Sequence, residues 1–304
     1  MIYTCTTNPS LDYYLKFKNQ LEIGDINRCT KEQFAAGGKG VNVSIILNNL
    51  MIPSTALGFL GGFTRDYYLS FLKQYPYIQP RFTTIEGNTR INVKLSAIDE
   101  TDINATGPYI LKEEFEKFMN RIDRIDGSDT FILSGNVQTE IYDDIVNMID
   151  ILSQRNVRII LDTNPKLMAD CLKFKPLLVK PNLEELEELC EKTVKDEQAI
   201  IKCASKLVEN GAQNVIVSMG ADGAMLINSE GAYKCSKITG DVISTTGCGD
   251  SMVGAYVFNL QRGANAFEAF HFACAAGYAT AFKEGLANRE DIENIYKQIT
   301  IERI

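Results

Sequence analysis

The stretch STTGCGDSMVGAYVFNLQ, residues 244 to 261 of this 304-residue chain, holds the residue types best suited to chemistry. Asp250 follows Gly247 and Gly249, which flank Cys248. Beyond it, apolar residues recur at helical spacing: Met252, Val253, Tyr256, Val257 and Leu260. We therefore expect a helix that begins near Cys248 and carries Asp250 in its first turn.

The start of such a helix is suited to an anion that gains negative charge as it reacts. Its first amides have no intrahelical acceptor, and the helix dipole adds roughly half a positive charge there. Gly247 and Gly249 let a bulky anion approach the backbone closely. Asp250 can accept a proton from a neighbouring hydroxyl. The plainer alternative is that Asp250 is a first-turn acid favoured by the dipole alone.

A second glycine-rich motif, AAGGKGVNVSIILNNL, spans residues 35 to 50. It is not a Walker A loop, because Gly40 follows Lys39 where that loop requires Ser or Thr. Gly37, Gly38, Lys39 and Asn42 open a helical pattern and suit a polyol or a phosphate. The alternative is a tight strand-to-helix turn with no ligand.

Four short apolar runs, DTFILSGN, VRIILDTNP, LLVKPN and NVIVSMG, each end in polar residues. Continuous apolar runs are typical of strands buried on both faces, and helical patterns lie between them. This alternation predicts an α/β doubly wound fold, with a mostly parallel sheet flanked by helices. Ligands of such folds bind beyond the carboxyl ends of the strands. Polar residues at four of these ends, Ser134, Asp162, Lys180 and Ser218, therefore favour a site there.

Two segments, approximately 11–36 and 88–106, depart from this alternation and show a period of two with turn residues. We expect them to form a small inserted β-sheet. Such a sheet is a natural lid over a site, and its exposed face is a candidate surface for a homodimer.

Composition excludes several classes of protein. The net charge of -8, without blocks of like charge, argues against nucleic-acid and anionic-membrane partners. No apolar run is long enough to cross a bilayer, and the N-terminus lacks the pattern of a signal peptide. The eight cysteines include no C-x-x-C pair, which favours reduced thiols and a cytoplasmic location. The single histidine excludes a multi-histidine metal site.

Taken together, AGGKGVNVS and TTGCGDSMVGA resemble the paired signatures of the PfkB (ribokinase-like) family of sugar kinases. NPSLD, TRINVKL, KPNLEEL and VSMGADGAM extend the resemblance over essentially the whole chain. The resemblance implies one ribokinase-like α/β kinase domain over residues 1–304, with the small sheet as its lid. It is strongest to the branch that acts on phosphorylated ketohexoses.

The resemblance also assigns roles on the acceptor side. It implies that Asp250 is the catalytic base and that the amides of Gly247, Cys248 and Gly249 form an anion hole for the phosphoryl group in transit. The residues implied to bind the sugar phosphate are Asp12, Arg28, Gly37, Gly38, Lys39, Asn42, Arg90 and Asn136. Among these, Lys39, Arg28 and Arg90 are the candidates for the substrate phosphate.

On the donor side, the resemblance implies ATP and Mg²⁺. Asn182 and Glu185 match an N-x-x-E motif that organises the metal around the nucleotide phosphates through water. Ser218, Gly220 and Gly223, together with Asn182, match nucleotide-binding positions. The implied reaction is phosphorylation of D-fructose 1-phosphate at O6. The alternatives are a tagatose-6-phosphate kinase and a catalytically silent sugar-phosphate sensor.

Three departures from the family pattern bear on the substrate. The usual SGSLPxG reads SGNVQTE here, so Asn136 replaces a serine. Cys248 stands where alanine or serine is usual and adds bulk and sensitivity to oxidation. Tyr278 follows Gly277 in the helix expected beside the adenine, where small residues are common.

Overall fold

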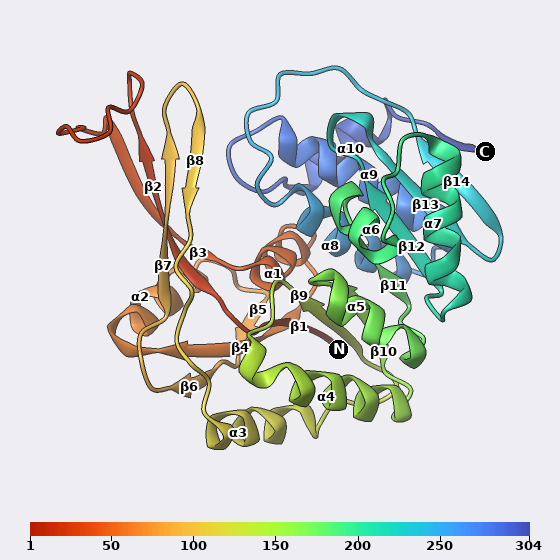
Figure 1. Ribbon diagram of the computed structural model, residues 1–304, viewed down its shortest axis with the longest axis horizontal. Coiled ribbons are helices and arrows are strands. Elements are labelled where there is room, and N and C mark those ends of the chain that lie inside the picture. The colour runs from red at the N-terminus through yellow and green to blue at the C-terminus, as the bar shows by residue number, and fades with distance from the viewer.

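The computed structural model describes residues 1–304 and is built around an eleven-stranded sheet (Figure 1). Its strands are β1 (Ile2–Thr6), β4 (Ser54–Gly61), β5 (Ile78–Pro80), β6 (Thr83–Ile85), β9 (Thr130–Ser134), β10 (Arg158–Asp162), β11 (Leu178–Val179), β12 (Asn214–Ser218), β13 (Ala224–Asn228), β14 (Gly231–Cys235) and β15 (Ile301–Arg303). Their order is β15-β14-β13-β12-β11-β10-β9-β1-β4-β5, and β6 also pairs with β4. Strands from β12 to β5 run parallel, whereas β13 to β15 form an antiparallel edge.

Helices cover both faces of this sheet. One face carries α3 (Lys112–Ile122), α4 (Tyr142–Gln154), α5 (Pro165–Cys171), α6 (Leu183–Cys190) and α7 (Glu197–Glu209). The other carries α1 (Lys39–Asn49), α8 (Cys248–Gln261), α9 (Ala266–Ala281) and α10 (Arg289–Tyr296), while α2 (Gly62–Leu72) packs near β4. Alternate residues of β9 enter the two cores: Phe131 and Leu133 pack into one core, and Ile132 packs into the other. Burial on both faces explains why these strands read as continuous apolar runs, and the predicted α/β fold is confirmed.

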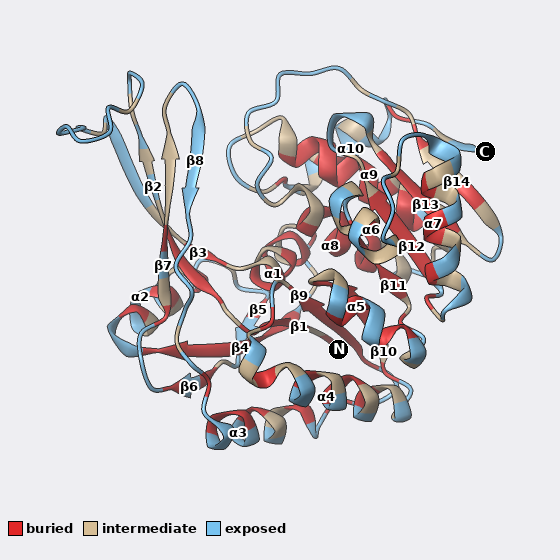
Figure 2. Ribbon diagram, in the orientation of Figure 1, coloured by how far each residue is buried: buried red, intermediate tan, exposed pale blue.

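A separate four-stranded sheet stands away from this body (Figure 1). Its order is β3 (Lys31–Gly37), β2 (Ser10–Lys16), β7 (Arg90–Ser96) and β8 (Glu100–Ile103). All four strands lie within or beside the two segments expected to form a small sheet. Figure 2 shows that the end of this sheet next to the body is buried while its far end is exposed.

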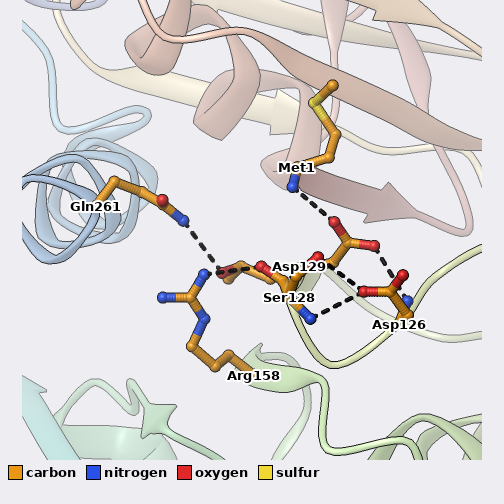
Figure 3. A network of polar contacts seen from close by, with 7 residues as sticks. Met1, Asp126, Ser128, Asp129, Arg158 and Gln261 are labelled. Carbon is orange, nitrogen blue, oxygen red and sulfur yellow. Dashed lines mark hydrogen bonds and ion pairs between the residues drawn. The ribbon is translucent and has the colours of Figure 1, made fainter.

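Different groups lie at the two ends of the parallel strands of the main sheet. At the end where the parallel strands begin, polar contacts link the chain start to neighbouring loops and to α8 (Figure 3). The amino group of Met1 pairs with Asp129 at 2.6 Å, and Gln261 Nε2 donates to Thr130 Oγ1 at 3.5 Å. At the opposite end, where these strands finish, α1 and α8 begin. None of the helices has both the length and the apolar character needed to span a bilayer.

Candidate active site

A buried carboxylate joins two lysines at the carboxyl ends of β10 and β11. The Asp162 side chain is 1% exposed. Its Oδ1 atom forms ion pairs with the Nζ atoms of both Lys39 and Lys180, each at 3.3 Å. Burial alone would raise the pKa of Asp162, but the two ammonium groups outweigh it and hold that pKa below its ordinary value. Asp162 is therefore ionised and fixes both lysines at neutral pH.

The predicted helix begins where the sequence placed it, with Cys248 as the first residue of α8 and Asp250 in its first turn. Asp250 is buried, and its Oδ2 accepts a hydrogen bond from Asn42 Nδ2 in α1 at 2.8 Å. Burial, followed by the negative charge of Asp162, raises the pKa of Asp250 to about 6, although Lys39 and Asn42 oppose this shift. A carboxylate with such a pKa is a stronger base than an exposed aspartate and remains ionised at pH 7.

Bare backbone amides surround Asp250 at the start of α8. Gly247 adopts a φ of +80°, and the amides of Gly247 and Gly249 donate no hydrogen bond within the protein. A Cβ at Gly249 would lie 2.9 Å from Lys180 Nζ, so the ammonium group lies directly against the start of the helix. Unpaired amides, the helix dipole and Lys180 together suit this position to binding an anion.

Cys248 lies in this first turn, and its surroundings favour the protonated form of its thiol. Burial, followed by the charge of Asp250, raises the pKa of Cys248 to about 11. The thiol therefore stays protonated at neutral pH, and the thiolate is the form that oxidants attack. The raised pKa of Cys248 therefore lowers the fraction of thiolate open to oxidation.

Across the site, the root of the small sheet supplies a third buried carboxylate. Asp12 Oδ1 accepts hydrogen bonds from Ser10 Oγ at 2.6 Å and Asn92 Nδ2 at 3.1 Å. Burial raises the pKa of Asp12, an effect that these donors oppose. A Cβ at Gly37 would lie 2.2 Å from Asp12 Oδ2, so the backbone of the glycine motif rests directly on this carboxylate.

The three cations expected to hold a substrate phosphate do not lie together. Lys39 reaches Asp162, as described above, and Arg90 lies at the root of the small sheet. The guanidinium group of Arg90 donates to the carbonyls of Asn8 and Ala105 at 3.0 and 2.9 Å. Arg28 is exposed in the connection between β2 and β3 and forms no ion pair. Only Lys39 and Arg90 border the body of the site.

The residues expected at the nucleotide lie beside one another at the ends of β11 and β12. Asn182 and Ser218 pair as a parallel β-bridge. Asn182 Oδ1 accepts from the Glu185 amide and Glu185 Oε2 from the Asn182 amide, both at 2.8 Å, which forms a capping box at the start of α6. Gly220 and Gly223 shape the turn after β12, both with positive φ.

Asn136 is exposed after β9, and its carbonyl accepts a hydrogen bond from Thr7 Oγ1 at 3.1 Å. It therefore lies close to the end of β1. No hydrogen bond of the exposed Asn136 side chain is formed within the protein.

Buried polar atoms without partners gather at this same end of the molecule. Apart from the hydroxyl of Tyr256, all of them belong to residues at the ends of β1, β9 and β10 or at the root of the small sheet: Thr6 Oγ1, Asn8 Oδ1, Arg90 Nε, Ser134 Oγ, Gln138 Nε2 and Oε1, and Asp162 Oδ2. Buried polar groups are nearly always paired, so this concentration marks a region that is completed by ligand or ordered water.

Two residues of the site, Asp162 and Lys180, were expected from the sequence only as polar residues at strand ends, with no role assigned to either. Their only signal was a polar residue at the end of a buried strand, which they share with Ser134 and Ser218. The tertiary structure adds what the sequence lacks, because both side chains are buried and paired across neighbouring strands.

With this geometry established, comparison with known proteins is informative. The model of the pfkB family carbohydrate kinase matches residues 8–293. The 1-phosphofructokinases of Borreliella burgdorferi and Bacillus subtilis are 39% and 35% identical over 100% of this chain and 99% and 100% of their own. A D-tagatose-1-phosphate kinase of Bacillus licheniformis is 33% identical over 99% of both chains.

Solved structures agree with this pattern. A Staphylococcus aureus crystal structure is 40% identical, with a TM-score of 0.86 over 100% of this chain and 99% of its own. Phosphofructokinase-2 from Escherichia coli, in complex with substrates and products, is 27% identical with a TM-score of 0.93 over 98% of both chains. Its tetrameric inhibited form has a TM-score of 0.90. These likenesses confirm the ribokinase-like fold.

The raised pKa of Asp250 gives a prediction about stability. Because its folded pKa of about 6 exceeds its ordinary value of 3.8, ionised Asp250 weakens folding at a pH above about 6 and has no effect below about 4. Asp250→Asn should therefore raise the melting temperature at pH 7.5, with a gain that disappears towards pH 4. Scanning calorimetry across this range measures the effect.

Asp291→Asn is the control of opposite sign. Lys283 and the Asn288 amide outweigh the effect of burial and lower the pKa of Asp291, so its substitution should reduce the melting temperature at pH 7.5. A lower melting temperature of Asp250→Asn at pH 7.5 would contradict the prediction, because it would mean that the ionised Asp250 stabilises the fold.

Proposed function

Since the chain belongs to the pfkB family of carbohydrate kinases, we propose that it transfers the γ-phosphoryl group of ATP to O6 of D-fructose 1-phosphate, giving fructose 1,6-bisphosphate. The observation that carries this proposal is Asp250, a buried carboxylate of raised pKa among the unpaired amides that begin α8. A base and an anion site within one helical turn are the two parts that phosphoryl transfer to a hydroxyl requires.

In this mechanism Asp250 accepts the proton of the O6 hydroxyl as that oxygen attacks phosphorus. Asn42 holds the carboxylate by its hydrogen bond to Oδ2 and leaves the other oxygen, Oδ1, to face the hydroxyl. Asp162 keeps Lys39 and Lys180 beside the reacting groups. The amides of Gly247 and Gly249, with that of Cys248, whose hydrogen bond to the Thr245 carbonyl is long at 3.5 Å, stabilise the charge on the phosphoryl oxygens in transit. Such stabilisation is the larger part of catalysis in these reactions.

Mg²⁺ is proposed as the metal that accompanies ATP. The donor set fits an indirect role, because Asn182 and Glu185 supply oxygen atoms but each already accepts an amide of the capping box. No group of three or more acidic, histidine or cysteine side chains forms a ready metal cage. Asn182 and Glu185 would therefore hold the hydrated ion through water, and the ion would neutralise phosphate charge when bound.

The substrate assignment is supported by the relatives named as 1-phosphofructokinases, which match over the full chain. Asp12 and Asn42 are the proposed contacts of the sugar hydroxyls, and Arg90 is the proposed cation for the substrate phosphate. The alternative expected from the sequence was tagatose 6-phosphate, but the related protein is named D-tagatose-1-phosphate kinase, which supports D-tagatose 1-phosphate as the alternative substrate instead. A silent sensor would need neither the base nor the metal-organising pair.

The test of this function is an ADP-release assay with ATP and Mg²⁺ on five acceptors: the 1- and 6-phosphates of fructose and of tagatose, and fructose itself. Turnover should be highest with fructose 1-phosphate.

Asp250→Ala should lose roughly 10²- to 10⁴-fold in kcat, the usual contribution of a positioned base. In the wild type, kcat/KM should fall as the pH drops through about 6, because Asp250 must be ionised to act.

The exposed Asp66→Ala variant controls for nonspecific loss of a carboxylate. An Asp250→Ala enzyme with wild-type kcat would remove Asp250 from the mechanism, and a preference for another acceptor would change the substrate while leaving the mechanism in place.

For the metal, Glu185→Gln should raise the Mg²⁺ concentration needed for half-maximal activity by about 10-fold, as for the loss of an outer-shell group. Titration of activity with Mg²⁺ at saturating ATP measures this. Glu184→Gln, one residue earlier and exposed on the same turn of α6, is the matched control. Equal Mg²⁺ requirements in the two variants would contradict the role of Glu185.

We further propose a homodimer through the face of the small sheet that lies opposite Asp12. Strand alternation places Leu15, Val93, Leu95 and Ile103 on that face, and all four are partly or largely exposed. Apolar side chains exposed together on a sheet favour a protein partner. The E. coli relative described as tetrameric shows that this fold assembles into oligomers.

Val93→Asp should shift the protein towards monomer in sedimentation velocity, because it buries a charge in the proposed interface. Ser96→Asp, on the other face of the same strand, should leave the mass unchanged. An unaltered oligomer in Val93→Asp, or a wild-type monomer at micromolar concentration, would exclude this surface.

A further inference from the structure

Two tyrosines of the chain, Tyr68 and Tyr256, are completely buried, but only one of their hydroxyl groups forms a hydrogen bond. Tyr68 lies in α2, packs edge-on against Phe82, and donates a hydrogen bond from its hydroxyl to the carbonyl of Gly37 at 2.8 Å. The hydroxyl of Tyr256, in α8, has no partner. A tyrosine with its hydroxyl tied to one backbone atom, in an otherwise apolar cluster, fixes that atom in space.

The atom that Tyr68 holds belongs to the peptide at which β3 ends. Gly37 is the last residue of β3, where it pairs with Ser10 of β2, and Gly38 lies beyond the ladder with a φ of +126°, so no side chain limits rotation of the peptide between them. A trans peptide directs its C=O and N–H to opposite sides. By drawing the carbonyl of Gly37 towards α2, Tyr68 therefore directs the N–H of Gly38 away from α2.

That N–H has no acceptor in the protein, whereas the carbonyl of Gly38 accepts from the Asn42 amide at 3.0 Å. Its surroundings are those of the proposed acceptor site. Gly37 rests against the Asp12 carboxylate, and Lys39 comes directly after Gly38. An unpaired backbone donor beside these groups is suited to an oxygen of a sugar phosphate.

We propose that Tyr68 is a positioning residue for the sugar phosphate, holding the Gly37–Gly38 peptide so that the Gly38 N–H is presented to an acceptor oxygen of the bound substrate. This inference rests on the proposed function. Tyr68 itself does not touch the substrate, because it is enclosed behind β3. α2 is in turn fixed to the root of the small sheet by Thr64, whose hydroxyl donates to the Thr89 carbonyl at 2.9 Å.

Tyr68→Phe removes only the hydroxyl. Without it the glycine peptide can rotate, and substrate binding must order it again. The KM for fructose 1-phosphate should rise about 5- to 10-fold, the effect of one hydrogen bond, while kcat and the KM for ATP change less than 2-fold. A purely structural role would instead lower the melting temperature without this split between the two substrates.

Tyr256→Phe is the matched control, because it removes an equally buried hydroxyl that has no partner and lies outside the glycine motif. Both KM values should stay at the wild-type level. The inference is overturned if Tyr68→Phe leaves the KM for fructose 1-phosphate unchanged, or if Tyr256→Phe raises it equally.

A measurement on the wild-type protein keeps the inference testable even if Tyr68→Phe does not fold. With ¹⁵N-glycine labelling, the Gly38 amide resonance should shift, and its hydrogen exchange should slow, when fructose 1-phosphate is added without ATP. An unaffected Gly38 amide at saturating ligand overturns the inference. Binding that perturbs Gly38 without any ATP consumption would refute the proposed kinase function and leave standing the contact between the Gly38 N–H and the sugar phosphate on which the role of Tyr68 depends.

Discussion

The shared ion pair of Asp162 with Lys39 and Lys180 is the interaction on which the site depends. Lys39 opens α1, Asp162 ends β10, and Lys180 follows β11, so one buried carboxylate sets the relative positions of three elements. Removing one partner of the buried pair Asp162–Lys180 typically costs about 3–5 kcal/mol, because a charge is left uncompensated, whereas Lys39 is 42% exposed and its loss costs less. The same constraint keeps two ammonium groups beside Asp250, whose own pKa is raised by burial and then by the charge of Asp162.

The site lowers the stability of the folded state, and packing in the two cores offsets this loss. Asp250 is ionised at neutral pH although burial disfavours its charge, and several buried polar atoms around it lack partners. Each such feature weakens the folded state and is retained where a ligand completes it. The antiparallel edge and the helix layers, by contrast, show no such concentration. The stabilising interactions thus lie away from the strand ends proposed to bind the substrates.

The departures from the family pattern acquire different meanings in the structure. Cys248 contributes backbone to the start of α8, and its protonated thiol adds bulk without adding a nucleophile. Tyr278 donates from its hydroxyl to the Ser236 carbonyl at 3.4 Å and lies close to Gly223, so it borders the turn proposed for the nucleotide. Asn136 is exposed beside the end of β1. These departures therefore alter the borders of the site, and Asp250 with its ion network is unaltered.

The sequence by itself determined the features that depend on neighbouring residues. Apolar runs specified the buried strands, helical spacing after Gly249 specified α8, and a period of two specified the small sheet. Only the tertiary structure decided which of these residues meet. Lys39 and Asp162 are 123 positions apart, and Asn42 and Asp250 are 208 apart. Their pairing depends on strand order and helix packing, which local patterns do not encode, and the bond from Tyr68 to Gly37 had no signal in the sequence for the same reason.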